Sequence, residues 1–149
     1  MARVLIIAEH LNGQLNGATA RCVTCAKALN AEAIDVLVLS DAGQAVAEQA
    51  AKISGVSKVL VADNAANAHA IAQVLAPQIA EAANGYSHVF GPSTTFGKDL
   101  MPCVAALLGV AQVSDVMTVE SSHSFKRPIY AGNAIITVNA PSDKAVVAT

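Results

Sequence analysis

The sequence has no tryptophan, only 3% aromatic residues and only 13% charged residues. Apolar residues make up 54% of the chain, and most of them are alanine and valine. The core of a 149-residue domain must therefore be built from small side chains, which suits helices packed closely on a sheet. The net charge of -2 gives no basic excess, so we expect no nucleic-acid partner.

Long apolar runs are also missing from the sequence. No run approaches the roughly 18 residues that a membrane-spanning helix needs, so we expect no direct membrane insertion. The N-terminal segment turns polar at Glu9 and His10, and it has neither the long apolar core nor the cleavage site of a secretory signal. Three cysteines in such a chain are most simply reduced thiols, which predicts a cytoplasmic protein.

Strand-like and helix-like segments alternate over the first 109 residues. We predict strands at 3–8, 34–40, 56–63 and 87–91, and helices at 18–29, 44–53, 67–83 and 96–108. Pro77 falls inside the third of these helices, where it predicts a kink or a split. This order predicts a three-layer α/β/α fold with a mainly parallel sheet, related to Rossmann folds and to the adenine-nucleotide hydrolases.

The pattern changes after Gly109, because no helix separates the next strand-like runs. Lys126–Tyr130 and Ile135–Asn139 are expected to form an antiparallel hairpin, since the turn between them supplies Gly132 and Asn133, which tolerate positive φ. The last run, KAVVAT, is strand-like and ends without a polar tail. We therefore expect residues 1–149 to be one domain that has been cut from a longer protein.

The segment GPSTTFGKDLMP, Gly91–Pro102, lies between a predicted strand and a predicted helix. It resembles a phosphate-binding P-loop, but five residues separate Gly91 from Gly97 where that loop has four. Asp99 also occupies the position of the hydroxyl that binds Mg²⁺. The spacing and the carboxylate together exclude a P-loop.

Two interpretations of Ser93–Lys98 remain. The hydroxyls and backbone amides of Ser93–Thr95 offer an anion site at the start of a helix. Alternatively, Thr94 or Thr95 caps that helix, and Lys98 is solvated. We favour the capping interpretation, and we leave open whether the segment faces a partner.

Cys22 and Cys25 form a Cys-x-x-Cys pair. A redox dithiol of this kind lies at the exposed start of a helix, whereas these two cysteines lie inside one, on the same face as Ala18 and Leu29. A zinc site would need two more ligands, and neither Cys103 nor the four histidines have suitable spacing. We therefore expect Cys22 and Cys25 to pack in the core.

Glu9 and His10 end the first predicted strand, at the sheet edge where open α/β folds bind ligands. Both residues have acid–base chemistry, but the sequence shows no partner for them, so we interpret them as polar strand-end residues. Residues 12–17 are expected to form a flexible loop without the Rossmann glycine pattern. Lys126 and Arg127 are adjacent in a strand and so should point to opposite faces, which excludes a joint anion clamp.

Three segments of the chain are distinctive: VLIIAEH (Val4–His10), GPSTTFGKDLMPCVAALLGVAQVSDV (Gly91–Val116) and FKRPIYAGNAIITV (Phe125–Val138). Together they closely resemble the N-terminal domain of the electron-transfer flavoprotein alpha subunit family. The resemblance covers essentially the whole chain. One position departs from it, because the family usually has a basic residue after LMP and this chain has Cys103. If the basic residue makes a subunit contact, this chain does without it or compensates elsewhere; the alternative is that Cys103, seven residues after Phe96, has joined the core.

The resemblance implies an electron carrier that pairs with a beta subunit and binds FAD. Such proteins carry electrons from dehydrogenases, for example the acyl-CoA dehydrogenases of fatty acid β-oxidation, to a membrane quinone oxidoreductase. The family holds FAD mainly in a second domain that is absent from these 149 residues. The resemblance therefore assigns no catalytic, cofactor-binding or metal-binding residue here, and we expect a scaffold that docks on the beta subunit without binding flavin itself.

Two other functions are compatible with the sequence. The first is a stand-alone module that binds adenine nucleotides between the strand ends at Ala8–His10 and Gly91–Thr95. The second is a small dithiol oxidoreductase that uses Cys22 and Cys25, which the predicted burial of both thiols disfavours.

Overall fold

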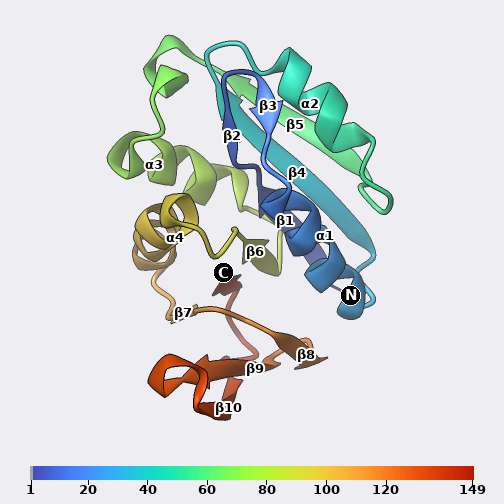
Figure 1. Ribbon diagram of the computed structural model, residues 1–149, viewed down its shortest axis with the longest axis vertical. Coiled ribbons are helices and arrows are strands. Elements are labelled where there is room, and N and C mark those ends of the chain that lie inside the picture. The colour runs from blue at the N-terminus through green and yellow to red at the C-terminus, as the bar shows by residue number, and fades with distance from the viewer. Residues whose placement is uncertain (1) are drawn as a thin grey trace.

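The computed structural model describes residues 2–149 (Figure 1). Its strands are β1 (Arg3–Ile7), β2 (His10–Leu11), β3 (Gln14–Leu15), β4 (Ala33–Ser40), β5 (Lys58–Asp63), β6 (His88–Phe90), β7 (Gln112–Val113), β8 (Thr118–Ser121), β9 (Ser124–Ile129), β10 (Ala134–Asn139) and β11 (Val146–Ala148). Its α-helices are α1 (Ala18–Ala28), α2 (Gln44–Ala51), α3 (Ala72–Ala82) and α4 (Thr95–Leu108), and its 3₁₀ turns are η1 (Ala65–Ala68) and η2 (Tyr130–Gly132).

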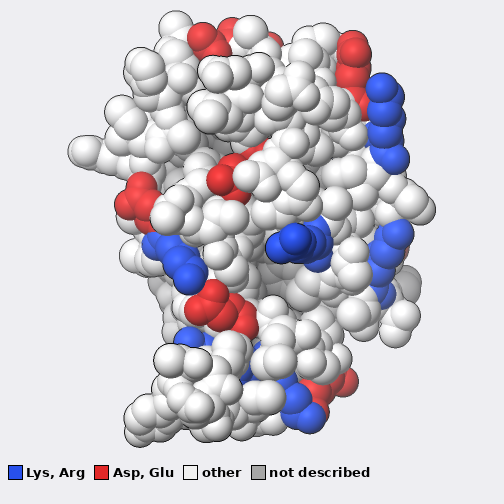
Figure 2. All heavy atoms as spheres, in the orientation of Figure 1, with Lys and Arg blue, Asp and Glu red and all other residues white. Residues whose placement is uncertain are grey.

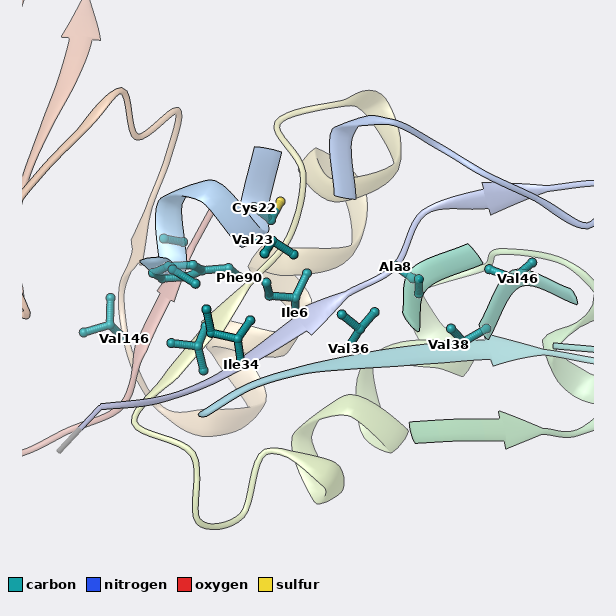
Figure 3. Packing of buried hydrophobic residues seen from close by; sticks show 14 of the residues in the cluster. Ile6, Ala8, Cys22, Val23, Ile34, Val36, Val38, Val46, Phe90 and Val146 are labelled. Carbon is teal, nitrogen blue, oxygen red and sulfur yellow. The ribbon is translucent and has the colours of Figure 1, made fainter. Parts of the chain in front are cut away.

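The centre of the fold is a six-stranded sheet with the order β5-β4-β1-β6-β11-β7, in which every pair of neighbours is parallel. Side chains alternate between its two faces. Ile6 and Val36 lie in a cluster with Val23 of α1 and Val46 of α2 (Figure 3). Residues of opposite parity face α3 and α4, where they form a second buried cluster (Leu5, Ile7, Leu37, Leu39, Leu75, Ile79, Leu100, Met101, Val104). The predicted three-layer α/β/α fold is thus confirmed.

The helix predicted at 67–83 begins later than expected, and Pro77 does not split it. The break lies at residues 69–71, between η1 and α3. Asn67 explains it, because its side chain is buried and donates to the Ala62 carbonyl and to Gln78, which fixes η1 as a separate turn. Pro77 lies in the second turn of α3, where only one backbone hydrogen bond is lost and the helix continues through it.

The expected antiparallel hairpin is present, and β8 extends it to a small three-stranded sheet with the order β10-β9-β8. Figure 1 shows this sheet projecting from the end of the molecule opposite α2. Gly132 has positive φ, whereas Asn133 has a φ of -76°. Tyr130 and Ala131 take positive φ instead, and the Asn133 amide donates to the Tyr130 carbonyl to hold the turn.

His88 joins the small sheet to the main one. Its ring is 1% exposed, and its Nε2 lies 2.7 Å from the Ser122 carbonyl oxygen in the turn between β8 and β9. Its Nδ1 lies 2.8 Å from the Ser87 hydroxyl, and Phe125 of β9 is fully buried in the core nearby. Sequence analysis assigned no role to this histidine, because its partner in the turn is 34 residues away.

The burial of His88 predicts a dependence of stability on pH. Burial lowers the pKa of His88 below its ordinary value of 6.5, with a smaller lowering from His123, while the hydrogen bond to Ser122 opposes the shift. Because the folded pKa lies below the unfolded one, stability is full above about pH 6.5 and is lost as the pH falls through the folded value. Denaturant titrations between about pH 7 and pH 5 should show a falling free energy of unfolding.

A variant pair tests whether His88 causes this fall. The His88→Gln variant should show a flatter pH dependence, whatever its stability at neutral pH. His69→Gln, which changes an exposed histidine before α3, should keep the slope of the unchanged protein. Equal slopes for all three proteins would contradict the assignment.

Candidate functional site

The strand order of the main sheet reverses between β1 and β6. Open parallel sheets bind ligands outside the carboxyl ends of the strands at such a point. Glu9 follows β1 there, and the segment Gly91–Thr94 follows β6. This edge is therefore where the structure should hold a ligand site, if it has one.

Glu9 and Thr94 link the two segments that follow β1 and β6. The Thr94 hydroxyl donates to the Glu9 carboxylate at 2.7 Å, and it accepts from the backbone N–H of Gly97 at 3.4 Å. Thr94 is thus the N-cap of α4, which confirms the capping interpretation. A carboxylate already lies beside the start of this helix, so a phosphate placed there would meet the charge of Glu9.

The two glycines of the segment allow the chain to pack tightly around this cap. A Cβ on Gly97 would lie 1.7 Å from the Pro92 carbonyl oxygen, and one on Gly91 would lie 2.6 Å from the Met101 side chain. Lys98 is 57% exposed, as expected, and its ammonium group lies 3.5 Å from Asp115. The glycines therefore serve helix packing, and the lysine makes a surface ion pair.

The segment 12–17 is ordered, and the prediction of a flexible loop was wrong. β2 and β3 form a hairpin whose turn places Asn12 and Gly13 at φ of 50° and 74°, as two-residue hairpin turns require. The Gln49 side chain of α2 accepts from the Leu15 N–H and donates to the Gly13 carbonyl. The Asn-Gly pair is a strong hairpin signal that sequence analysis overlooked.

His10 lies in this hairpin and is bound to the sheet. Its Nε2 lies 2.8 Å from the Leu39 carbonyl oxygen at the end of β4. Beside it is a cavity of about 390 Å³ at the carboxyl ends of β1 and β4, lined among others by Ser40, Asp41 and Phe96. The structure brings His10 to this cavity and Glu9 to Thr94, so it does not join the two residues into one acid–base pair.

Cys22 is buried and Cys25 is half-buried, and both pack against the cluster that α1 shares with the sheet (Figure 3). Burial raises the pKa of Cys22 to about 12, with a further contribution from Cys25, and burial raises that of Cys25 to about 11. Such thiols are protonated at neutral pH and are poor nucleophiles. The expectation of core packing is confirmed, and it leaves the dithiol oxidoreductase without support.

Cys103 is exposed, so the alternative in which it joins the core does not hold. The buried positions of α4 include Leu100, Met101 and Val104, and Cys103 lies on the opposite side of the helix from them. Its thiol is within 3.5 Å of the Asp99 carbonyl oxygen. Its side chain therefore occupies a surface position, as a basic residue would.

Lys126 and Arg127 have separate partners, as their alternation predicts. Lys126 forms an ion pair with Glu120 at 2.8 Å, and the Arg127 guanidinium donates to the Ser114 carbonyl at 2.7 Å. Lys126 and Arg127 therefore do not converge on a single anion. Among residues 2–149, no group of three or more histidine, cysteine or acidic side chains is arranged to hold a metal ion.

Sequence analysis also missed a buried carboxylate near the amino ends of the strands, at the opposite end of the sheet from the candidate site. Asp35 of β4 is 1% exposed and accepts from the Tyr86 hydroxyl at 2.5 Å. Arg3 and Lys58 lie 3.9 and 3.5 Å from the same carboxylate oxygen. Burial, and next the hydrogen bond to Asp35, raise the pKa of Tyr86 to about 12. This cluster ties β1, β4 and β5 together, and it stabilises the sheet away from the candidate site.

Comparison with known proteins identifies similar chains. Residues 4–149 match the family described as "Electron transfer flavoprotein domain". The chain is 54% identical over 144 residues to the electron transfer flavoprotein subunit alpha of Pseudomonas aeruginosa, a match that covers 97% of this chain and 46% of that protein. It is 46% identical to the subunit alpha of Paracoccus denitrificans, with 96% of this chain and 46% of that protein covered.

A more distant relative has the same name. The mitochondrial subunit alpha of Dictyostelium discoideum is 40% identical over 152 residues, which cover 97% of this chain and 42% of that protein. The chain therefore spans about half the length of the curated relatives it matches. Within residues 2–149, none of the helices combines the length and the apolar character needed to cross a membrane.

The contact between Gly97 and Pro92 predicts a strong effect of one added methyl group. Gly97→Ala should lower the free energy of unfolding by about 1–3 kcal/mol, because the new Cβ would overlap a backbone oxygen. Gly17→Ala is the matched control, since nothing lies within 4 Å of its Cβ and its φ is -60°. Chemical denaturation measures both, and similar losses would contradict the packing role of Gly97.

The thiols should differ in their rates of alkylation. In the native protein at about pH 8, N-ethylmaleimide should modify exposed Cys103 first, Cys25 much more slowly and Cys22 last. Peptide mapping by mass spectrometry gives the three rates, and unfolding in guanidinium should make them similar. A native rate at Cys22 or Cys25 above that of Cys103 would contradict the burial of the pair.

Proposed function

The chain belongs to the electron transfer flavoprotein family, and we propose that it is the N-terminal domain of an alpha subunit. The observation that carries the proposal is 54% identity over 97% of this chain to a subunit alpha. In this proposal the alpha subunit pairs with a beta subunit, and the complex is a cytoplasmic electron carrier with bound FAD. Its donors are dehydrogenases such as acyl-CoA dehydrogenases, and its acceptor is a membrane quinone oxidoreductase.

FAD, when bound, supplies the redox chemistry of such a carrier. The residues of this chain do not fit the cofactor. The helix start nearest the strand-order reversal is already capped by Thr94 and faces the Glu9 carboxylate, where a pyrophosphate would need free backbone amides. We therefore assign the flavin to a part of the complex outside these residues, and we assign no electron-transfer step to a side chain of this domain.

The role left for this domain is that of a scaffold that docks on the beta subunit. Its small-residue core and its parallel sheet give it a rigid body. On the face shown in Figure 2, charges of both signs are scattered and form no basic patch. A surface of this kind suits a stable protein partner more than it suits nucleic acid.

Co-production with the beta subunit of the same organism tests the proposal. The two chains should elute together in size-exclusion chromatography, and the isolated chain should lack the visible absorbance of a flavin. Separate elution at micromolar concentration would overturn the docking role. A yellow isolated chain would overturn the assignment of the flavin to other parts of the complex.

A second candidate function is supported by the 390 Å³ cavity at the carboxyl ends of β1 and β4. In this alternative the chain is a stand-alone module that binds an adenine nucleotide at that edge. Glu9 does not line this cavity, but its carboxylate lies beside the start of α4 and so disfavours a phosphate at that helix. Calorimetric titration of the chain with AMP and with ATP separates the two functions. Micromolar binding would favour the stand-alone module, and the absence of a heat of binding would exclude it.

A further inference from the structure

A groove runs along one side of α1, between this helix and the segment Val116–Val119. It consists of two adjoining hollows of about 210 and 370 Å³, and Arg21, Cys25 and Val116 line both of them. We call it the α1 groove. At one end it reaches the segment after β6, and at the other it reaches Ala28, near the end of α1.

The lining of the α1 groove is almost uncharged. Among residues 2–149, Arg21 has the only charged side chain that lines either hollow. It is exposed, and within residues 2–149 it makes neither a hydrogen bond nor an ion pair with another side chain. Lys98, Lys126 and Arg127 have partners, whereas Lys27 and Lys52 have no side-chain partner among residues 2–149 but do not line the groove. Arg21 thus stands unpaired at the junction of two apolar hollows.

The far wall of the groove suits a protein partner. Met117 is 55% exposed on the rim, and a methionine side chain adapts readily to the shape of what binds it. Thr24 and Ala28 are also exposed and small, so nothing on α1 blocks approach to the groove. An arginine in such surroundings pairs with a carboxylate through two parallel hydrogen bonds, which strengthen as water is excluded.

From these features we propose that the α1 groove binds a segment of the beta subunit in which small apolar side chains flank one acidic residue, and that Arg21 pairs with this acidic residue. The inference rests on the proposed function, which supplies the beta subunit as the partner. Charge complementarity selects the occupant, because a segment without a carboxylate would bury the Arg21 guanidinium unpaired.

Charge reversal at Arg21 tests the pairing. Arg21→Glu should weaken binding of the beta subunit about tenfold or more, measured by calorimetry with the two purified subunits. Arg21→Lys should weaken binding less than Arg21→Glu does, because it keeps the positive charge but loses the two parallel hydrogen bonds. Lys52→Glu is the matched control, since it reverses an exposed charge at the end of α2, outside the groove, and should leave the affinity unchanged. Thermal melting of each variant checks that the fold is intact.

Protection of a thiol from alkylation tests whether the beta subunit binds in the α1 groove. In a Thr24→Cys variant, the new thiol lies in the groove and Cys103 lies on the exposed side of α4. The beta subunit should slow alkylation at position 24 and leave Cys103 unaffected. Protection by the chain alone at high concentration would show that a second copy fills the groove, and it would overturn the proposal.

The outcomes separate the groove from the proposed function. If the unchanged chain binds the beta subunit while Arg21→Glu and Lys52→Glu bind equally well, the groove assignment is wrong and the alpha-subunit function stands. If position 24 is not protected in that complex, the same conclusion follows. If the unchanged chain does not bind the beta subunit at all, the docking function itself fails and the inference fails with it.

Discussion

The insertion of β11 between β6 and β7 is the constraint on which the rest of the fold depends. Val146–Ala148 pair in parallel with β6 on one side and with β7 on the other. Without these three residues, β7 would have no partner in the main sheet, and the small sheet β8–β10 would be attached through His88 and through the core contacts of Phe125, Val119 and Val138. The small sheet thus takes the place of the crossover helix that normally joins two neighbouring parallel strands.

The insertion also positions the candidate site and the groove. The Gly91 N–H donates to the Ala148 carbonyl, which fixes the start of the segment that carries Thr94. The Val116 N–H donates to the Thr149 carbonyl, which fixes the far wall of the α1 groove. The segment that carries Thr94 and the far wall of the α1 groove therefore both depend on β11, although they belong to different layers of the molecule.

Local patterns in the sequence predicted most of the elements, because apolar runs and helical periodicity depend only on near neighbours. The cap at Thr94 was predictable for the same reason, since it involves residues three positions apart. The pairing of Thr94 with Glu9 was not, because 85 residues separate them and only the strand order brings them together. β11 was likewise predicted as a strand, whereas its place in the sheet depends on contacts that no local pattern encodes.

The errors have physical causes as well. The core alternative for Cys103 rested on its spacing to Phe96, but Phe96 is itself only half-buried and so does not mark the buried side of α4. The hairpin at 10–15 was missed although Asn12-Gly13 encodes its turn, because its strands are only two residues long. Part of its stability comes from Gln49, which is remote in the sequence.

One strand of the small sheet has a consequence for how the protein behaves in solution. β10, with the sequence AIITVN, pairs only with β9, so its outer edge carries unpaired backbone groups within the described residues. Natural sheets protect such edges with lysine, proline or a bulge, and β10 has none of these. At high concentration this edge offers a second copy of the chain a strand to pair with, however well the core is packed.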